Sequence, residues 1–283
     1  MAYFLAVASA ALYGAADFLG GLTSRHASTI AIVVVSQFAG MLTLAVLLPV
    51  LPGSFPGGAD LWWGAAAGLA GSAGVALLYR ALAIGTMAIL APTTAVCAVA
   101  IPVMAGVAFG ERPSASAAAG IALAVVAIVL VSRRDLGIGM PGPSARRLPP
   151  GIGLALASGV AIGLFFLALS RTSPEGGMWP LLVARIVSVG GFGLIAVAGR
   201  RTLAMPPRVL WLAVLGGILD MSANALYLIA VRGGPLTGVV TLSSLYPAST
   251  VMLARVVLGE RLSTTQTVGI AGALVAVVLI VRG

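Results

Sequence analysis

The chain has 283 residues, of which 60% are hydrophobic and only 8% are charged, and its mean hydropathy is +1.13. In soluble domains about a quarter of all residues are charged, so this composition excludes an ordinary soluble protein and indicates a membrane protein. The formal net charge of +9 comes from sixteen Arg against seven acids, with no Lys. Most of these Arg flank apolar runs, where they would meet lipid headgroups, so we expect contact with the bilayer and no binding of nucleic acid.

The apolar runs of the chain are each long enough for a transmembrane helix, which needs about 20 mostly apolar residues. In chain order they predict helices over 3–22, 29–51, 61–82, 86–108, 114–132, 151–170, 179–199, 209–231, 235–257 and 264–282. The first run lacks a basic flank, which favours a retained helix over a signal peptide. The fold class we predict is therefore an all-α membrane protein with ten transmembrane helices.

The two halves of the chain resemble each other when one is shifted by 149 residues onto the other. Trp62 then falls on Trp211, and "GIALAVVAIVLV" falls on "GIAGALVAVVLI". This predicts a five-helix repeat at 1–133, a linker at 134–150 and a second repeat at 151–283. Five is an odd number, so the second repeat would be inverted relative to the first, an arrangement typical of secondary transporters. A purely structural duplication is the alternative.

A Gly-Glu-Arg motif stands at equivalent points of both halves, in "FGERPS" and "LGERLS". Each motif ends one apolar run and precedes the next. We expect each Gly to end a helix and Ser114 or Ser263 to cap the following one. Glu111 and Glu260 are accordingly predicted to be structural residues, or residues at the edge of a gate.

These features resemble the drug/metabolite transporter superfamily, specifically its EamA-type ten-helix branch. The residues that carry the resemblance are Tyr79, Arg80, Ala81, Gly85, Pro92, Pro102, Gly110, Glu111, Arg112 and Gly120 in the first half and Tyr227, Gly233, Pro247, Gly259, Glu260, Arg261 and Gly269 in the second. The resemblance implies transport of amino acids, other metabolites, nucleotide sugars or drugs. It also implies an Arg in the second helix of each half; Arg185 matches, but Ser36 stands at the equivalent point of the first half.

Charged residues inside apolar runs are candidates for function, because each costs about 3 kcal/mol on insertion scales. Asp17, Arg185 and Asp220 are the clearest cases. The two Asp residues are our candidates for proton coupling, and ion pairs with Arg185 or Arg80 are the alternative. Arg80 and Arg255 lie near helix ends, where we expect them to extend toward the headgroups.

Uncharged polar and aromatic residues complete the predicted site, a cavity between the halves lined by the first, third, fourth, sixth, eighth and ninth helices. Four polar or helix-breaking residues of 235–257 share one predicted helical face. The predicted substrate-binding residues are Asp17, Tyr79, Thr94, Phe165, Phe166, Arg185, Asp220, Asn224, Tyr227, Ser243, Tyr246 and Pro247. Buried aromatic packing, helix–helix hydrogen bonds and packing kinks are the competing interpretations of the uncharged ones.

Enzyme chemistry has little support in the sequence, since His26 is the lone His, Cys97 is the lone Cys, and no metal or phosphate-loop motif stands in a credible context. We expect no cofactor and no metal. The sequence predicts a secondary transporter that exports small metabolites, aromatic or other hydrophobic amino acids first, across a bacterial inner membrane by alternating access. Its expected partners are the solute, the lipid bilayer and protons as a candidate coupling ion, with the chain a monomer or a homodimer. A channel or passive pore, an intramembrane enzyme, and a carrier of drugs or other metabolites are the alternatives.

Overall fold

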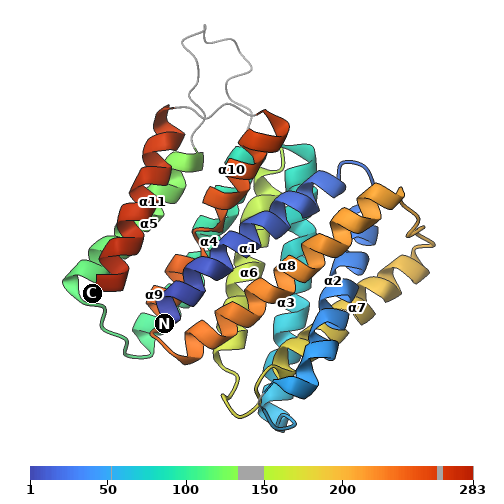
Figure 1. Ribbon diagram of the computed structural model, residues 1–283, viewed down its shortest axis with the longest axis horizontal. Coiled ribbons are helices and arrows are strands. Elements are labelled where there is room, and N and C mark those ends of the chain that lie inside the picture. The colour runs from blue at the N-terminus through green and yellow to red at the C-terminus, as the bar shows by residue number, and fades with distance from the viewer. Residues whose placement is uncertain (52, 133–149, 260–263, 283) are drawn as a thin grey trace, which may run out of the picture.

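The computed structural model of the chain describes residues 1–51, 53–132, 150–259 and 264–282, and the regular structure in these residues is entirely helical (Figure 1). The helices are α1 (Ala2–Thr23), α2 (Thr29–Leu47), η1 (Leu48–Val50), α3 (Gly58–Ile84), α4 (Met87–Ala108), α5 (Ala115–Ser132), α6 (Ile152–Ser170), α7 (Trp179–Ala198), α8 (Pro207–Arg232), α9 (Leu236–Ser243), α10 (Tyr246–Leu258) and α11 (Thr264–Arg282). The proposed linker at 134–150 lies almost wholly outside the described residues.

Seven stretches of the described chain are long and apolar enough to cross a membrane, namely α1, α2, α3, α6, α7, α8 and the α9–α10 segment. The helices α4, α5 and α11 complete the ten predicted spans. The predicted bounds agree with the observed ones within about four residues, because apolar runs and the turn residues between them are local signals. The all-helical prediction is confirmed.

The ninth predicted span differs from the prediction, because it is two helices rather than one. The helix that begins at Leu236 ends at Ser243, and α10 begins at Tyr246 with Pro247 in its first turn. A proline in a continuous helix would clash with the carbonyl four residues earlier, here that of Ser243, and could not bond to it. The expected polar face across 243–250 is therefore not one helical face.

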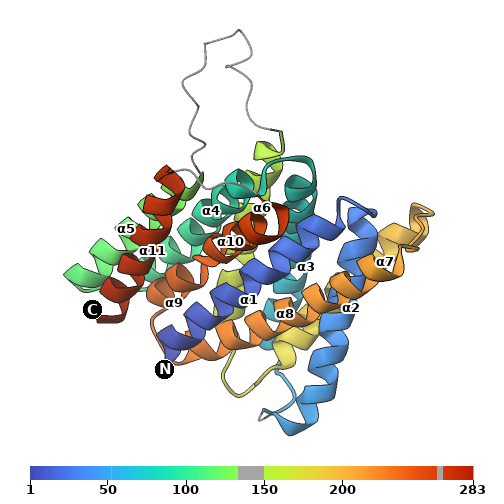
Figure 2. The ribbon, with the colours of Figure 1, turned by 45° about the horizontal axis from the view of Figure 1, so that its top comes forward.

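The packing of the helices repeats when the two halves are exchanged (Figures 1 and 2). Helix α1 packs along α8 as α6 packs along α3, and α2 contacts α8 as α7 contacts α3. Helix α4 contacts α6 as α9 and α10 contact α1, while α5 pairs with α11. Each helix of one half thus packs mainly on the other half, so the interior of the bundle lies between the two halves.

Two hydrogen bonds between the halves are equivalent when the halves are exchanged. Ser9 donates to the carbonyl of Ala223 at 2.8 Å, and Ser158 donates to the carbonyl of Gly74 at 2.7 Å. The donors are 149 residues apart, and so are the acceptors. The two bonds therefore join the halves at positions that the 149-residue shift makes equivalent.

The outer surface of the bundle is apolar. Trp62 and Trp211, equivalent residues of the two repeats, are 78% and 71% exposed near the starts of α3 and α8. Tryptophan favours the interface between lipid and water, so these positions suit the two edges of a membrane. Arg80 and Arg255 are exposed, as expected for side chains that extend toward headgroups.

Candidate functional site

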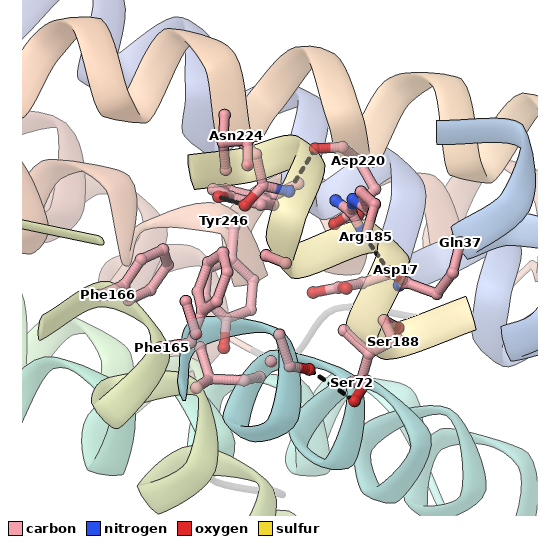
Figure 3. A pocket seen from close by; sticks show the side chains of 18 residues that line it. Asp17, Gln37, Ser72, Phe165, Phe166, Arg185, Ser188, Asp220, Asn224 and Tyr246 are labelled. Atoms are coloured by element: carbon pink, nitrogen blue, oxygen red, sulfur yellow. Dashed lines mark hydrogen bonds and ion pairs between the residues drawn. The ribbon is translucent and has the colours of Figure 1, made fainter. Parts of the chain in front are cut away.

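A cavity lies between the halves, near the middle of the long helices (Figure 3). Its walls come from α1, α2, α3, α6, α7, α8 and α10. Small residues of α3, among them Gly68, Gly71 and Ser72, leave room for it. Among the described residues, none from α4 lines the cavity, whereas α2 and α7 both contribute.

The centre of the polar wall is an ion pair between α7 and α8. The guanidinium of Arg185 donates to the carboxylate of Asp220 at 2.5 Å, and its other terminal nitrogen donates to the side-chain oxygen of Gln37 on α2. All three side chains are buried. A buried ion pair recovers its desolvation cost only when further hydrogen bonds complete it, and Gln37 supplies one.

Asn224 extends this network to α1, one turn after Asp220 on α8. It donates to the carbonyl of Asp220 at 2.6 Å and accepts a hydrogen bond of 2.8 Å from the hydroxyl of Tyr13. The Tyr13 ring therefore has a fixed position at the border of the cavity. One network thus joins α1, α2, α7 and α8.

Three other polar side chains of the lining have no partner among the described residues. The buried hydroxyls of Ser188 and Tyr246 make no hydrogen bond there, and Asp17, only 8% exposed, makes neither a hydrogen bond nor an ion pair. Buried polar groups are nearly always hydrogen-bonded, and each exception calls for an explanation. Two buried hydroxyls without a partner and one carboxyl group without an ion pair, all at one cavity, suit a polar occupant.

The opposite wall of the cavity is aromatic. Phe165 and Phe166 of α6 lie with ring centroids 5.5 Å apart, and Phe166 meets the edge of Tyr13 at 5.8 Å. The ring of Tyr13 also lies 6.5 Å from that of Tyr246. In Figure 3, Phe165 and Phe166 lie across the cavity from Arg185 and Asp220.

Comparison with known families places this cavity in a known kind of protein. The model of the EamA-like transporter family matches residues 1–133 and 149–282. The chain belongs to the EamA-like transporter family. It is therefore a multi-pass membrane transporter of the drug/metabolite type, with the ten-helix fold of that family. The two matched segments coincide closely with the two predicted repeats.

Solved structures agree with this EamA-like fold, and 28 chains match significantly. One of them, titled "Crystal structure of protein", has a TM-score of 0.66 and 19% sequence identity, covering 99% of this chain and 98% of its own. At that identity the likeness shows the fold alone. No curated protein matches the chain significantly.

Seven of the twelve residues predicted for the transporter's binding site line the cavity. They are Asp17, Phe165, Phe166, Arg185, Asp220, Asn224 and Tyr246. The other five do not line the cavity. Three of them donate a hydrogen bond to a backbone carbonyl of another helix: Thr94 to Ala155 at 3.1 Å, Tyr227 to Phe166 at 3.0 Å and Ser243 to Ala6 at 3.5 Å. Tyr79 is packed against Gly20, and Pro247 begins α10.

Tyr13 and Ser188 line the cavity but were not among the predicted site residues. Tyr13 precedes Asp17 by four residues and so shares its helical face, a spacing that could have identified it. Ser188 had no comparable signal, because a single Ser in an apolar helix is common. Gln37 was also absent from the predicted site residues; it lines the cavity and accepts a hydrogen bond from Arg185.

The Gly-Glu-Arg motif of the first repeat is structural in this transporter. Gly110 has a φ of +96°, which glycine adopts readily, and the amide of Ala117 donates to Ser114 at the start of α5. The carboxylate of Glu111 accepts hydrogen bonds from the amides of Leu236 and Thr237 at 2.7 and 2.9 Å. It thus caps α9, in the other repeat. Glu260, Arg261 and Ser263 of the second motif lie outside the described residues.

Proposed function

We propose that this EamA-like transporter exports small amphiphilic metabolites, amino acids with aromatic or aliphatic side chains first, across a bacterial inner membrane. The observation that carries the proposal is the two-sided cavity between the repeats. One wall offers the carboxyl group of Asp17, which forms no ion pair, and the unbonded hydroxyls of Ser188 and Tyr246 to a polar group. The other wall offers the rings of Phe165 and Phe166 to an apolar group. A solute with a polar group at one end and an apolar group at the other would contact both walls at once.

Alternating access is the proposed mechanism. The repeats pack on each other through equivalent contacts, so exchanging their conformations would open the cavity at the opposite face of the membrane. Small residues at the contacts favour such movement, as at Gly68, where an added Cβ would lie 2.5 Å from the carbonyl oxygen of Ala184.

Proton coupling is proposed for Asp17 rather than Asp220. The charge of Asp220 is already compensated by Arg185, whereas Asp17 forms no ion pair among the described residues. A buried carboxylate without a partner is costly, so its charge requires either a proton or a positively charged solute as compensation. We expect Asp17→Asn to abolish pH-driven transport. Asp220→Asn would instead unpair Arg185 and weaken the folded protein.

Counterflow in proteoliposomes tests the proposal. Vesicles loaded with one unlabelled amino acid should accumulate the labelled form transiently, because a carrier exchanges solute faster than it returns empty. A panel of aromatic, aliphatic and charged amino acids, with drugs and other metabolites beside it, identifies the solute class. A channel would show no stimulation by internal solute, and absence of exchange for every amino acid would refute the amino-acid proposal.

A further inference from the structure

We infer that Asp17 forms a subsite for a positively charged amino group, so that the transporter selects amphiphilic primary amines whether or not they carry a carboxylate. This rests on the proposed function, since it names the chemical group that the same cavity recognises. Asp17 lies in the second half of α1, and its carboxyl group points into the cavity (Figure 3).

The charges of the described lining residues do not balance. Asp17 and Asp220 provide two carboxylates, and Arg185 provides one guanidinium. Both terminal nitrogens of Arg185 are engaged, one by Asp220 and one by Gln37. The lining therefore has one negative charge in excess when both carboxyl groups are ionised, and this charge belongs to Asp17.

The imbalance separates cationic from anionic solutes. A solute carboxylate would have to displace Asp220 from Arg185, which breaks a buried pair before a new one forms. An ammonium group meets Asp17 without displacing anything, because Asp17 has no partner among the described residues. The amine of an amino acid is thus the group that the cavity needs, and its carboxylate is optional.

The surroundings of Asp17 suit an amine with an apolar tail. Tyr13 lies one helical turn before it, and the ring of Tyr13 contacts the rings of both Phe166 and Tyr246. Aromatic faces attract ammonium groups and also pack well against alkyl or aryl tails. The hydroxyls of Ser188 and Tyr246 remain for a hydroxyl or carboxylate when the solute has one.

Three probes with the same ring system test the subsite: phenylalanine, phenethylamine and 3-phenylpropionate. Binding to the purified full chain in detergent is measured by isothermal titration and by the shift in Tm. We expect the amine and the amino acid to bind with similar affinity and the acid to bind at least about tenfold more weakly, as the loss of a charge-assisted hydrogen bond predicts.

The variant Asp17→Asn should lower the affinity for phenethylamine at least about tenfold without lowering Tm, since it removes a buried charge that has no protein partner. Glu175→Gln is the matched control, because it removes one carboxylate from an exposed loop and should leave the affinity unchanged. If Asp17→Asn fails to fold, Asp17→Glu tests the same point, because it keeps the charge and should retain amine selectivity.

The outcomes separate the subsite from the proposed function. Equal binding of the acid and the amine, or unchanged amine affinity in folded Asp17→Asn, overturns the subsite even if amino acids undergo counterflow. Amine binding that requires Asp17, together with no counterflow of any amine or amino acid, supports the subsite and refutes the proposed function.

Discussion

The two ends of the helix bundle are joined by different chemistry at related places in the repeats, and we expect these contacts to close the cavity. We call the end where α1 begins the proximal end and the end where α1 finishes the distal end. At the proximal end α8 is tied to the loop between α6 and α7 by Arg232. At the distal end α1 meets α3 through Gly20 and Tyr79. The pairs α6–α8 and α1–α3 are equivalent under the repeat, so the ends can be compared directly.

The proximal closure is polar. Arg232 donates to the carbonyls of Gly177 and Ser173, both at 2.7 Å. Ser173 in turn donates through its amide and its hydroxyl to Asp60 of α3, at 2.8 and 2.6 Å. A chain of hydrogen bonds therefore links α8, the α6–α7 loop and α3.

The distal closure is a tighter contact, made by packing of a ring against a helix. Tyr79 is only 1% exposed, and its ring occupies the space that a side chain at residue 20 would fill. Gly21 lets α1 approach Leu82 in the same way, since an added Cβ would lie 2.7 Å from the Leu82 side chain. Helix α1 accordingly packs on α3 more extensively than α6 packs on α8.

This difference shows that the repeat preserves the backbone plan but not the chemistry of closure. The 149-residue shift places Leu169 and Leu228 opposite Gly20 and Tyr79, and Ala83 opposite Arg232. Water can replace the bonds of Arg232 as they break, whereas the contact of Gly20 with Tyr79 tolerates no added atom. We therefore expect substitutions at the distal end to have the larger effects.

The largest effect is expected for Gly20→Ala. Its Cβ would overlap the buried Tyr79 ring. Overpacking of this kind costs about 1–3 kcal/mol, which would shift the equilibrium between the closed and the open distal end about 5- to 150-fold toward the open end. Cys97 is the lone Cys, so Cys97→Ser with Ser188→Cys gives a single cavity thiol. Labelling of this thiol by an impermeant maleimide added at the distal side should accelerate.

Gly216→Ala is the matched control for Gly20→Ala. It makes the same chemical change in α8, but its Cβ would lie 3.5 Å from that of Leu19, an ordinary contact. Its labelling rate should equal that of the parent. Equal labelling of the Gly20 and Gly216 variants would show that Tyr79 does not close the distal end.

A smaller effect is expected for Arg232→Gln at the proximal end. The substitution removes the charge-assisted bonds to Ser173 and Gly177, and because Arg232 is partly exposed we expect a loss of about 1.5 kcal/mol, roughly a tenfold shift toward the open proximal end. The same cavity thiol should then be labelled faster from the proximal side and no faster from the distal side. Arg25→Gln, at an exposed loop residue, serves as the control; acceleration from both sides would point to general loosening instead of a gate.

The fold was predictable from the sequence because its signals are local. Apolar runs and the Gly and Pro turns between them located the helices, and only the break before Tyr246 was missed, since Pro247 acts on a carbonyl four residues earlier. The five-helix repeat stays a prediction, drawn from the shift that aligns the Gly-Glu-Arg motifs and the tryptophans.

The site was only partly predictable. Asp17, Arg185 and Asp220 were found because charges inside apolar helices are rare. Which Asp pairs with Arg185 depends on how α7 and α8 cross, and no local pattern specifies that. The sequence did not single out Asp60, for a related reason. An acid in the first turn of a helix is common. Its partner Ser173 lies in the other half of the chain, so no local pattern connects the two.

Asp60→Asn should have the smallest effect of the three and shows whether the proximal closure acts as one unit. Asn keeps one acceptor oxygen, so about 1 kcal/mol is lost, a shift of about fivefold in the same direction as for Arg232→Gln. Because Asp60 and Arg232 both hold Ser173, their effects should not add: the double variant should label little faster from the proximal side than Arg232→Gln alone. Fully additive effects would mean that the two residues act independently, and the closure would then consist of two separate contacts, each weaker than the single packing contact at the distal end.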